Sequence, residues 1–108
     1  MTTKVRVDSP ICDKYTEITA IESGDRVLLN ISSDCKSVKH YAEVLGDVGM
    51  DDLLDIKGSK IIDLASEVGL TATCLIPVAI YNACWIEKGM ISRRLALDKG
   101  HACIVFLE

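Results

Sequence analysis

The chain has 108 residues, of which 49% are hydrophobic and 26% are charged, and its formal net charge is −4. This length fits one compact domain, residues 1–108, with a hydrophobic core of modest size. The acidic balance and the small aromatic content (one Trp, three Tyr and one Phe) disfavour a nucleic-acid binder, which needs a basic stripe or stacking platforms. The longest apolar stretch, around residues 75–80, is far shorter than the roughly 20 residues of a membrane span.

Three strands are predicted in the first third of the chain. Residues 3–8 alternate between apolar and polar side chains, residues 15–22 are rich in Thr, Ile and Tyr, and residues 27–31 alternate again. Pro10 and Gly24 interrupt the pattern between them. Consecutive strands joined by short turns predict an antiparallel meander.

A first helix is predicted directly after the third strand. Ser33 or Asp34 is a suitable N-cap, and apolar residues then recur at helical spacing as far as Val48. Gly46 and Gly49 mark its end. The segment that follows, residues 50–58, is predicted to be irregular or a single turn, and the acidic stretch Asp47 to Asp55 is interpreted as a solvated connection between helices.

Two further helices complete the predicted helical region. The second begins at Ser59 as its cap and ends at Gly69. The third is capped by Thr73 or Cys74, carries Pro77 in its first turn, where proline costs little, and ends near residue 89.

The last residues predict one more strand. Residues 101–107 are apolar on both faces, which is typical of a central strand buried on both sides. Residues 90–97 show no clear pattern. The order is therefore βββαααβ, and the fold class is α+β: a two-layer sandwich in which helices cover one face of an antiparallel meander.

The predicted topology brings three distant cysteines together. Cys12 follows the first strand, Cys35 follows the third strand, and Cys74 begins the third helix, so all three are expected at one rim of the domain. Cys84, within a helix, and Cys103, in the last strand, are expected away from it and are interpreted as packing residues. An odd count of five cysteines and the absence of an N-terminal apolar leader favour a reducing, cytoplasmic setting.

Position also predicts reactivity for two of these thiols. Cys35 and Cys74 fall in the cap or first turn of a helix, where unpaired N–H groups and partial positive charge favour an anion. Thiolate is the species that binds metals and attacks electrophiles. We therefore expect lowered pKa values at these two positions.

Three hypotheses for function follow. In the first, the protein is an accessory or redox protein that binds an iron–sulfur cluster or zinc through Cys12, Cys35 and Cys74, with Asp34 as a candidate further ligand; a cofactor-free protein is equally compatible with the sequence. In the second, a sulfur-carrier or thiol-redox protein uses Cys74 or Cys35 as nucleophile. In the third, the cysteines are inert and an exposed edge strand, residues 26–32, pairs with a second subunit. A protein partner or homodimer is expected, and no catalytic residue is assigned, because the chain lacks recognisable hydrolytic motifs.

Three short segments resemble a known group of proteins. Pro10-Ile11-Cys12, Ser33-Asp34-Cys35 and Cys74-Leu75-Ile76-Pro77 resemble segments of a small family of uncharacterised proteins from methanogenic archaea and related anaerobes, a domain of unknown function. The resemblance implies an oxygen-poor, reducing cytoplasm, which suits a labile cluster, and it supplies no catalytic residue. The last segment is also similar to the Cys-Pro-x-Pro helix start of small sulfur-carrier proteins, with Leu75 in place of the first proline.

Overall fold

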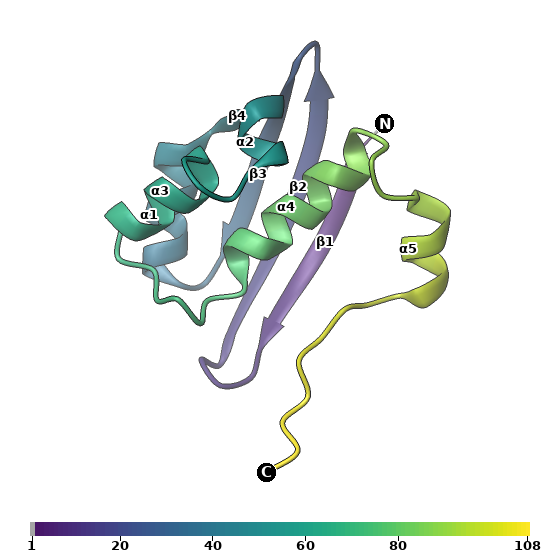
Figure 1. Ribbon diagram of the computed structural model, residues 1–108. Helices are drawn as coiled ribbons and strands as arrows, with labels where there is room; N and C mark the ends of the chain where they lie inside the picture. Colours follow the sequence, from purple (N-terminus) through teal and green to yellow (C-terminus); the bar gives the residue numbers. More distant parts are fainter. Residues whose placement is uncertain (1) are drawn as a thin grey trace.

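The computed structural model describes residues 2–108 and has the predicted α+β class. Its sheet is antiparallel and four-stranded, in the order β1-β2-β3-β4. The strands are β1 (Thr2–Ser9), β2 (Lys14–Ser23), β3 (Arg26–Ser33) and the short β4 (Asp47–Gly49). The first three strands form the predicted meander, and Figure 1 shows them as long neighbouring ribbons.

Alternation along the strands decides which face of the sheet is buried. Val7, Ile18 and Val27 point to the covered face and are buried. Lys4 and Glu17 lie on the opposite face, where they form an exposed ion pair of 3.3 Å. One face of the meander is therefore apolar and requires a cover, and the other stays in contact with solvent.

Five helices follow or interrupt the strands. They are α1 (Lys36–Leu45), α2 (Met50–Leu54), α3 (Lys60–Glu67), α4 (Ile76–Glu87) and α5 (Arg93–Lys99). Helix α4 packs on β1 and β2, and α1 packs on β3, on the same side of the sheet (Figure 1). The predicted two-layer sandwich is confirmed. None of the helices within residues 2–108 is long and apolar enough to cross a membrane.

Aromatic side chains join the helices to one another through hydrogen bonds. The hydroxyl of Tyr41, a fully buried residue of α1, donates to the carbonyl of Ile61 in α3 at 2.6 Å. Trp85 in α4 donates from Nε1 to the carbonyl of Leu53 in α2 at 2.7 Å. These bonds satisfy polar groups that would otherwise be costly to bury, and they fix the helices over the sheet.

The first predicted helix is shorter than expected. Helix α1 ends at Leu45, because Gly46 adopts a positive φ of 65° that turns the chain back toward the sheet. Val48, predicted as a helical residue, instead lies in β4 opposite Val27 of β3. The segment 50–58 contains the single turn of helix α2, and α3 begins after Ser59 as predicted.

The predicted last strand is wrong. Residues 101–108 have no regular secondary structure and all of them are exposed. Four successive apolar residues, from Ile104 to Leu107, are between 66% and 89% exposed. An apolar run forms a strand only where its backbone pairs with the edge of a sheet, and this run does not pair with the sheet of its own chain. Helix α5 occupies part of the segment 90–97 that showed no clear pattern.

The predicted edge strand also needs correction. Strand β4 pairs with residues Arg26 to Leu28 of β3, so the first part of residues 26–32 is internal to the sheet. Strand β1 is the free edge along its whole length, because its only strand partner is β2.

Candidate functional site

Two of the three candidate cysteines lie at the same end of the sheet. The register pairs Ser9 with Lys14 and Thr16 with Ser33, so the end of β1, the start of β2 and the end of β3 are neighbours. Cys12 lies in the turn between β1 and β2 and is exposed. Cys35 directly follows β3 and is half-buried.

The N-cap of α1 is Cys35, with φ −90° and ψ 123° and no side-chain capping bond, and not Ser33 or Asp34 as predicted. Its own N–H donates to Ser33 Oγ at 3.1 Å, and Ser33 Oγ also lies 2.7 Å from Thr16 Oγ1. The carboxylate of Asp34 accepts the N–H of Tyr15 at 3.0 Å. These bonds anchor the start of α1 to β2, so Ser33 and Tyr15 hold the segment that carries Cys35. Ser33 had been predicted as a helix cap, whereas Tyr15 had not been singled out.

Cys74 lies two residues before α4, whose N-cap is Leu75 and not Thr73 or Cys74 as predicted. Its N–H donates to the carbonyl of Thr71 at 3.0 Å, which closes a turn ahead of the helix. The side chain is half-buried and packs against the hydrophobic core.

The pKa of the Cys74 thiol is raised, which contradicts the expected lowering at a helix start. Burial is the largest cause, and the backbone N–H of Ile76 opposes it without outweighing it. Because the thiol faces the core, desolvation of the thiolate exceeds the stabilisation that the helix start offers.

The remaining causes of this shift bear on the arrangement of the rim. Negative charge on Cys35, and to a smaller extent on Cys12, raises the pKa of Cys74 further. Such repulsion acts only between groups that lie near one another. Cys74 is therefore placed near Cys35 and Cys12, although it follows Cys12 by 62 positions in the chain (74 − 12).

The arrangement does not form a ready metal site. Within residues 2–108, no group of three or more His, Cys, Asp or Glu side chains is placed so that it could hold a metal ion. Asp34, the candidate further ligand, is engaged by the N–H of Tyr15.

A shallow hollow of about 290 Å³ lies beside the turn that carries Cys12. It is lined by Asp8, Ser9, Pro10, Asp13, Lys14, Tyr15 and Asp34. Asp13 in this turn has a positive φ of 55°, a conformation that Asp tolerates better than most residues. The hollow gives the rim an open, polar approach on the Cys12 side.

The other two cysteines lie elsewhere. Cys84 is fully buried in α4, and burial raises its pKa to about 12, with the carboxylate of Glu87 adding to the shift. This residue is a packing residue, as predicted. Cys103 is exposed, in the C-terminal segment that forms no strand, so its interpretation as a packing residue is wrong.

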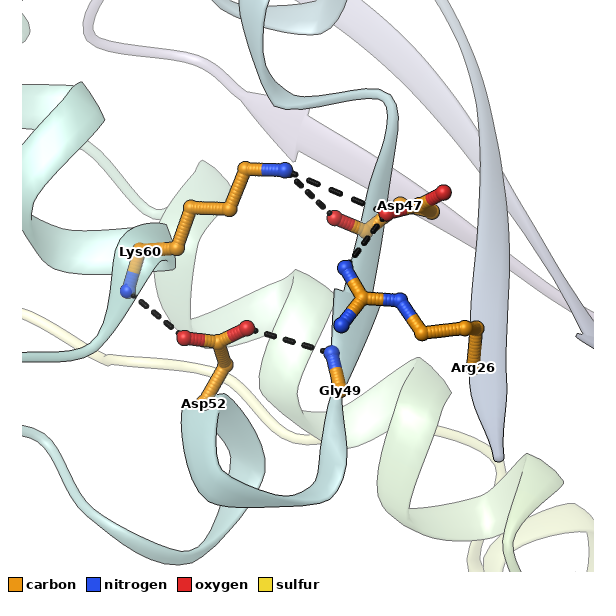
Figure 2. A network of polar contacts seen from close by, with 5 residues as sticks. All are labelled: Arg26, Asp47, Gly49, Asp52 and Lys60. Atoms are coloured by element: carbon orange, nitrogen blue, oxygen red, sulfur yellow. Dashed lines mark hydrogen bonds and ion pairs between the residues drawn. The ribbon is translucent and has the colours of Figure 1, made fainter.

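A polar cluster that the sequence analysis had interpreted as a solvated connection lies around β4 (Figure 2). Arg26 binds the carboxylate of Asp47, and this bond lowers the pKa of Asp47. Asp52 accepts the N–H groups of Gly49 and Lys60, each at 3.1 Å. Each charge is paired within the chain, so we interpret the cluster as a structural joint between β3, β4 and α3. An Asp three residues after a helix cap was the sequence indication of this role.

A second network at the start of β1 was missed altogether. The side chain of Glu87 is only 2% exposed, and it accepts bonds from Thr3 Oγ1 at 2.9 Å, from the Glu22 N–H at 2.9 Å and from Arg93 Nη2 at 3.1 Å. Burial alone would raise the pKa of Glu87, but these bonds outweigh it and the pKa lies below its ordinary value. The partners lie up to 84 positions away, so no local pattern could have revealed them.

Comparison with known proteins gives a family and no activity. No curated protein and no solved structure was found to match the chain. The DUF6951 profile, which describes a family of unknown function, matches residues 3–98 and so includes all of the sheet except Thr2, helices α1 to α4 and most of α5. The chain therefore belongs to the DUF6951 family.

Proposed function

We propose that the protein is a small accessory redox protein. It acts through the thiols of Cys12, Cys35 and Cys74 at the end of the sheet where a turn joins β1 to β2, which we call the hairpin end. The observation that carries this proposal is that Cys12 and Cys35 lie as free thiols at one end of the sheet, with the free thiol of Cys74 near enough for negative charge on either to raise its pKa. The proposed chemistry is thiol–disulfide exchange, which needs two sulfurs at a time and no preformed ligand set.

The proposed exchange assigns the first attack to Cys35, the N-cap of α1, and the second to Cys74. Cys35, at the mouth of α1, attacks a disulfide of a partner protein as the thiolate, and the partner's first sulfur leaves as a thiolate that takes up a proton. Cys74 then gives up its proton and attacks the Cys35 sulfur of the mixed disulfide, which releases the second partner thiol. The partner's disulfide gains two electrons and two protons, and Cys35 and Cys74 become an intramolecular disulfide.

The raised pKa of Cys74 is consistent with this division of roles. A half-buried thiol that stays protonated is a poor first nucleophile but can resolve a mixed disulfide formed beside it. Cys12 is the exposed thiol of the rim, on the turn next to the open hollow. Its position suits first contact with a partner protein. A reducing cytoplasm of an anaerobe, as the resemblance to archaeal proteins implies, is the proposed setting.

A second candidate is an iron–sulfur cluster or zinc bound by the same three cysteines. The observation in its favour is the gathering of three soft, sulfur-bearing side chains from separate elements near one another. The present arrangement does not hold a metal ion, so this candidate requires the turn that carries Cys12 to move toward the other two thiols.

The experiment that tests the proposal is a redox titration of the full chain with mapping of disulfides by mass spectrometry. The expected result is a reversible Cys35–Cys74 disulfide that forms and disappears with the potential of the buffer. It is lost in Cys35→Ser and in Cys74→Ser, and it survives in Cys103→Ser, the matched control for an exposed thiol outside the rim. Oxidation confined to Cys103, with Cys35 and Cys74 remaining reduced, would refute the exchange.

An anaerobic preparation distinguishes the metal candidate. The protein is purified without oxygen, its visible spectrum is recorded, and iron, zinc and acid-labile sulfide are measured. Metal binding is supported, and redox exchange rejected, if the wild type carries stoichiometric metal that each rim variant loses and Cys84→Ser keeps. The rim variants are Cys12→Ser, Cys35→Ser and Cys74→Ser. If all three rim variants leave both metal content and thiol exchange unchanged, the cysteines are inert and an interaction module remains.

A further inference from the structure

The C-terminal segment is the largest apolar feature of the molecule that no other element covers. Ile104, Val105, Phe106 and Leu107 are all at least 66% exposed, and residues 101–108 lie apart from the sheet (Figure 1). Exposed apolar runs of this kind are uncommon in single chains and mark places of association. The β-branched and aromatic residues of this run favour an extended strand over a helix.

The sheet offers an edge that matches this segment. Strand β1 (Thr2–Ser9) has β2 on one side and no strand on the other, so its outward backbone N–H and C=O groups are open to pairing. The opposite edge is less suitable, because β4 already pairs with the start of β3. At about 3.3 Å per residue, six residues extend over roughly 20 Å, which fits within the eight residues of β1.

The side chains of β1 also suit an added strand. Val5 lies on the covered face of the sheet and is only partly buried, at the free edge of the core. Alternate residues of a strand added beside β1 would point to this face and cover Val5 with apolar side chains. Helix α5, which precedes the C-terminal segment, is already held near this edge, because Arg93 donates from Nη1 to the carbonyl of Thr2 at 2.9 Å.

We propose that residues 102–107 of one chain add as a fifth strand to the β1 edge of a second copy of this chain. Each copy carries both the apolar segment and the free edge, and within one chain the two do not meet. A reciprocal exchange between two copies covers both segments and both edges and closes the assembly as a dimer. The segment follows the part of the chain that the family profile matches, so the exchange joins two copies of the family domain through an arm that lies after it. This proposal does not depend on the thiols of the rim.

The test measures the mass of the full chain by light scattering after gel filtration, in a reducing buffer so that Cys103 cannot form a disulfide. The expected mass is twice the 11.8 kDa of the chain. Val105→Pro fixes φ and removes a backbone N–H in the middle of the segment, so it disfavours an extended paired strand and should weaken dimerisation at least tenfold, which corresponds to about 1.4 kcal/mol. Val105→Thr keeps the N–H and the branched side chain, and it should remain dimeric.

Hydrogen exchange of the same three proteins identifies the edge. Amides of β1 should exchange slowly in the wild type and in Val105→Thr, and faster in Val105→Pro, while the amides of α4 stay unchanged as evidence that the fold is intact. The proposal is overturned by a wild-type chain that is monomeric at all concentrations, by a Val105→Pro dimer as stable as the wild type, or by a change that falls on β3 instead of β1. A monomer with protected β1 amides would place the segment on its own sheet and would also overturn it.

Discussion

The two ends of the sheet differ in how their polar groups are satisfied. At the start of β1, Glu87 is buried and accepts hydrogen bonds from three separate elements, and Arg93 secures α5 to the same point. At the hairpin end of the sheet, where a turn joins β1 to β2, Cys12 carries an exposed free thiol beside an open hollow, and Cys35 and Cys74 carry half-buried free thiols. The first end is held by hydrogen bonds and an ion pair within the chain. At the second end, the three cysteines form no disulfide.

This contrast separates a region whose interactions stabilise the fold from a region whose cysteine thiols are free. Buried charges are tolerated only when several donors compensate their desolvation, so the Glu87 network is a structural clamp. Partly exposed thiols carry little desolvation cost and remain accessible to reactants. The comparison predicts that substitutions at the clamp affect stability, and that substitutions at the rim affect thiol chemistry.

The largest effect is expected for Glu87→Ala. Removal of this carboxylate leaves Thr3, Arg93 and the Glu22 N–H without their acceptor, and we expect a loss of roughly 3 kcal/mol in the free energy of unfolding. Urea denaturation checks this value. Glu67→Ala, at an exposed residue of α3, is the control and should stay within about 0.5 kcal/mol of the wild type. Equal effects of the two substitutions would contradict a clamp.

The next effect separates the buried cysteine from the rim. Cys84 is 0% exposed, and Cys84→Ser places a hydroxyl in the core, which should cost about 2 kcal/mol. Cys12→Ser, at an exposed turn, should leave the free energy of unfolding unchanged within about 0.5 kcal/mol. The same urea experiments measure both. A destabilised Cys12→Ser with an unaffected Cys84→Ser would reverse the assignment of structural and reactive thiols.

The pH dependence of stability tests the clamp in another way. The pKa of Glu87 is lowered in the folded protein, so its contribution is fully present above its ordinary value of 4.5 and is lost as the pH falls through the lowered pKa. The difference in unfolding free energy between the wild type and Glu87→Gln should therefore narrow in acid. Urea titrations between neutral pH and strongly acid pH measure it. A difference that grows on acidification would mean that Glu87 is not held ionised.

The smallest effect is expected at the cluster around β4. Arg26 and Asp47 are partly exposed, so solvent screens their attraction. Asp47→Asn should destabilise the protein only slightly at low salt and not measurably at high salt. Thermal unfolding at two ionic strengths checks this expectation. A large, salt-independent loss would show that this pair acts as a buried clamp like Glu87.

Local patterns were sufficient for the main elements of the fold. The alternation around Val5 and Val7 predicts β1, and Ser59 marks the start of α3, because these preferences depend on near neighbours. Strand β4 has only three residues and no periodicity, so its formation depends on pairing with β3 and could not be predicted. The run ending at Leu107 resembles a strand, but a strand also needs a partner, and this run does not pair with the sheet of its own chain.

The candidate site was predictable in position and less so in chemistry. Counting strand directions places Cys12 and Cys35 at the same end, because topology alone determines this. The pKa of Cys74 depends on how deeply the thiol packs against the core, which its place before a helix does not reveal. The Glu87 clamp joins residues far apart in the chain, so only the folded structure discloses it.

The pH titration of the Cys74 thiol tests the central claim, that the rim thiols act on one another, most directly. The rate of Cys74 alkylation is followed against pH by mass spectrometry in the wild type, Cys35→Ser, Cys12→Ser and Cys103→Ser. Because charge on Cys35 and, less strongly, on Cys12 raises the pKa of Cys74, its titration should move to lower pH in Cys35→Ser. The shift of the Cys74 titration to lower pH should be smaller in Cys12→Ser and absent in Cys103→Ser. An identical Cys74 titration in all four proteins would contradict a coupled thiol site.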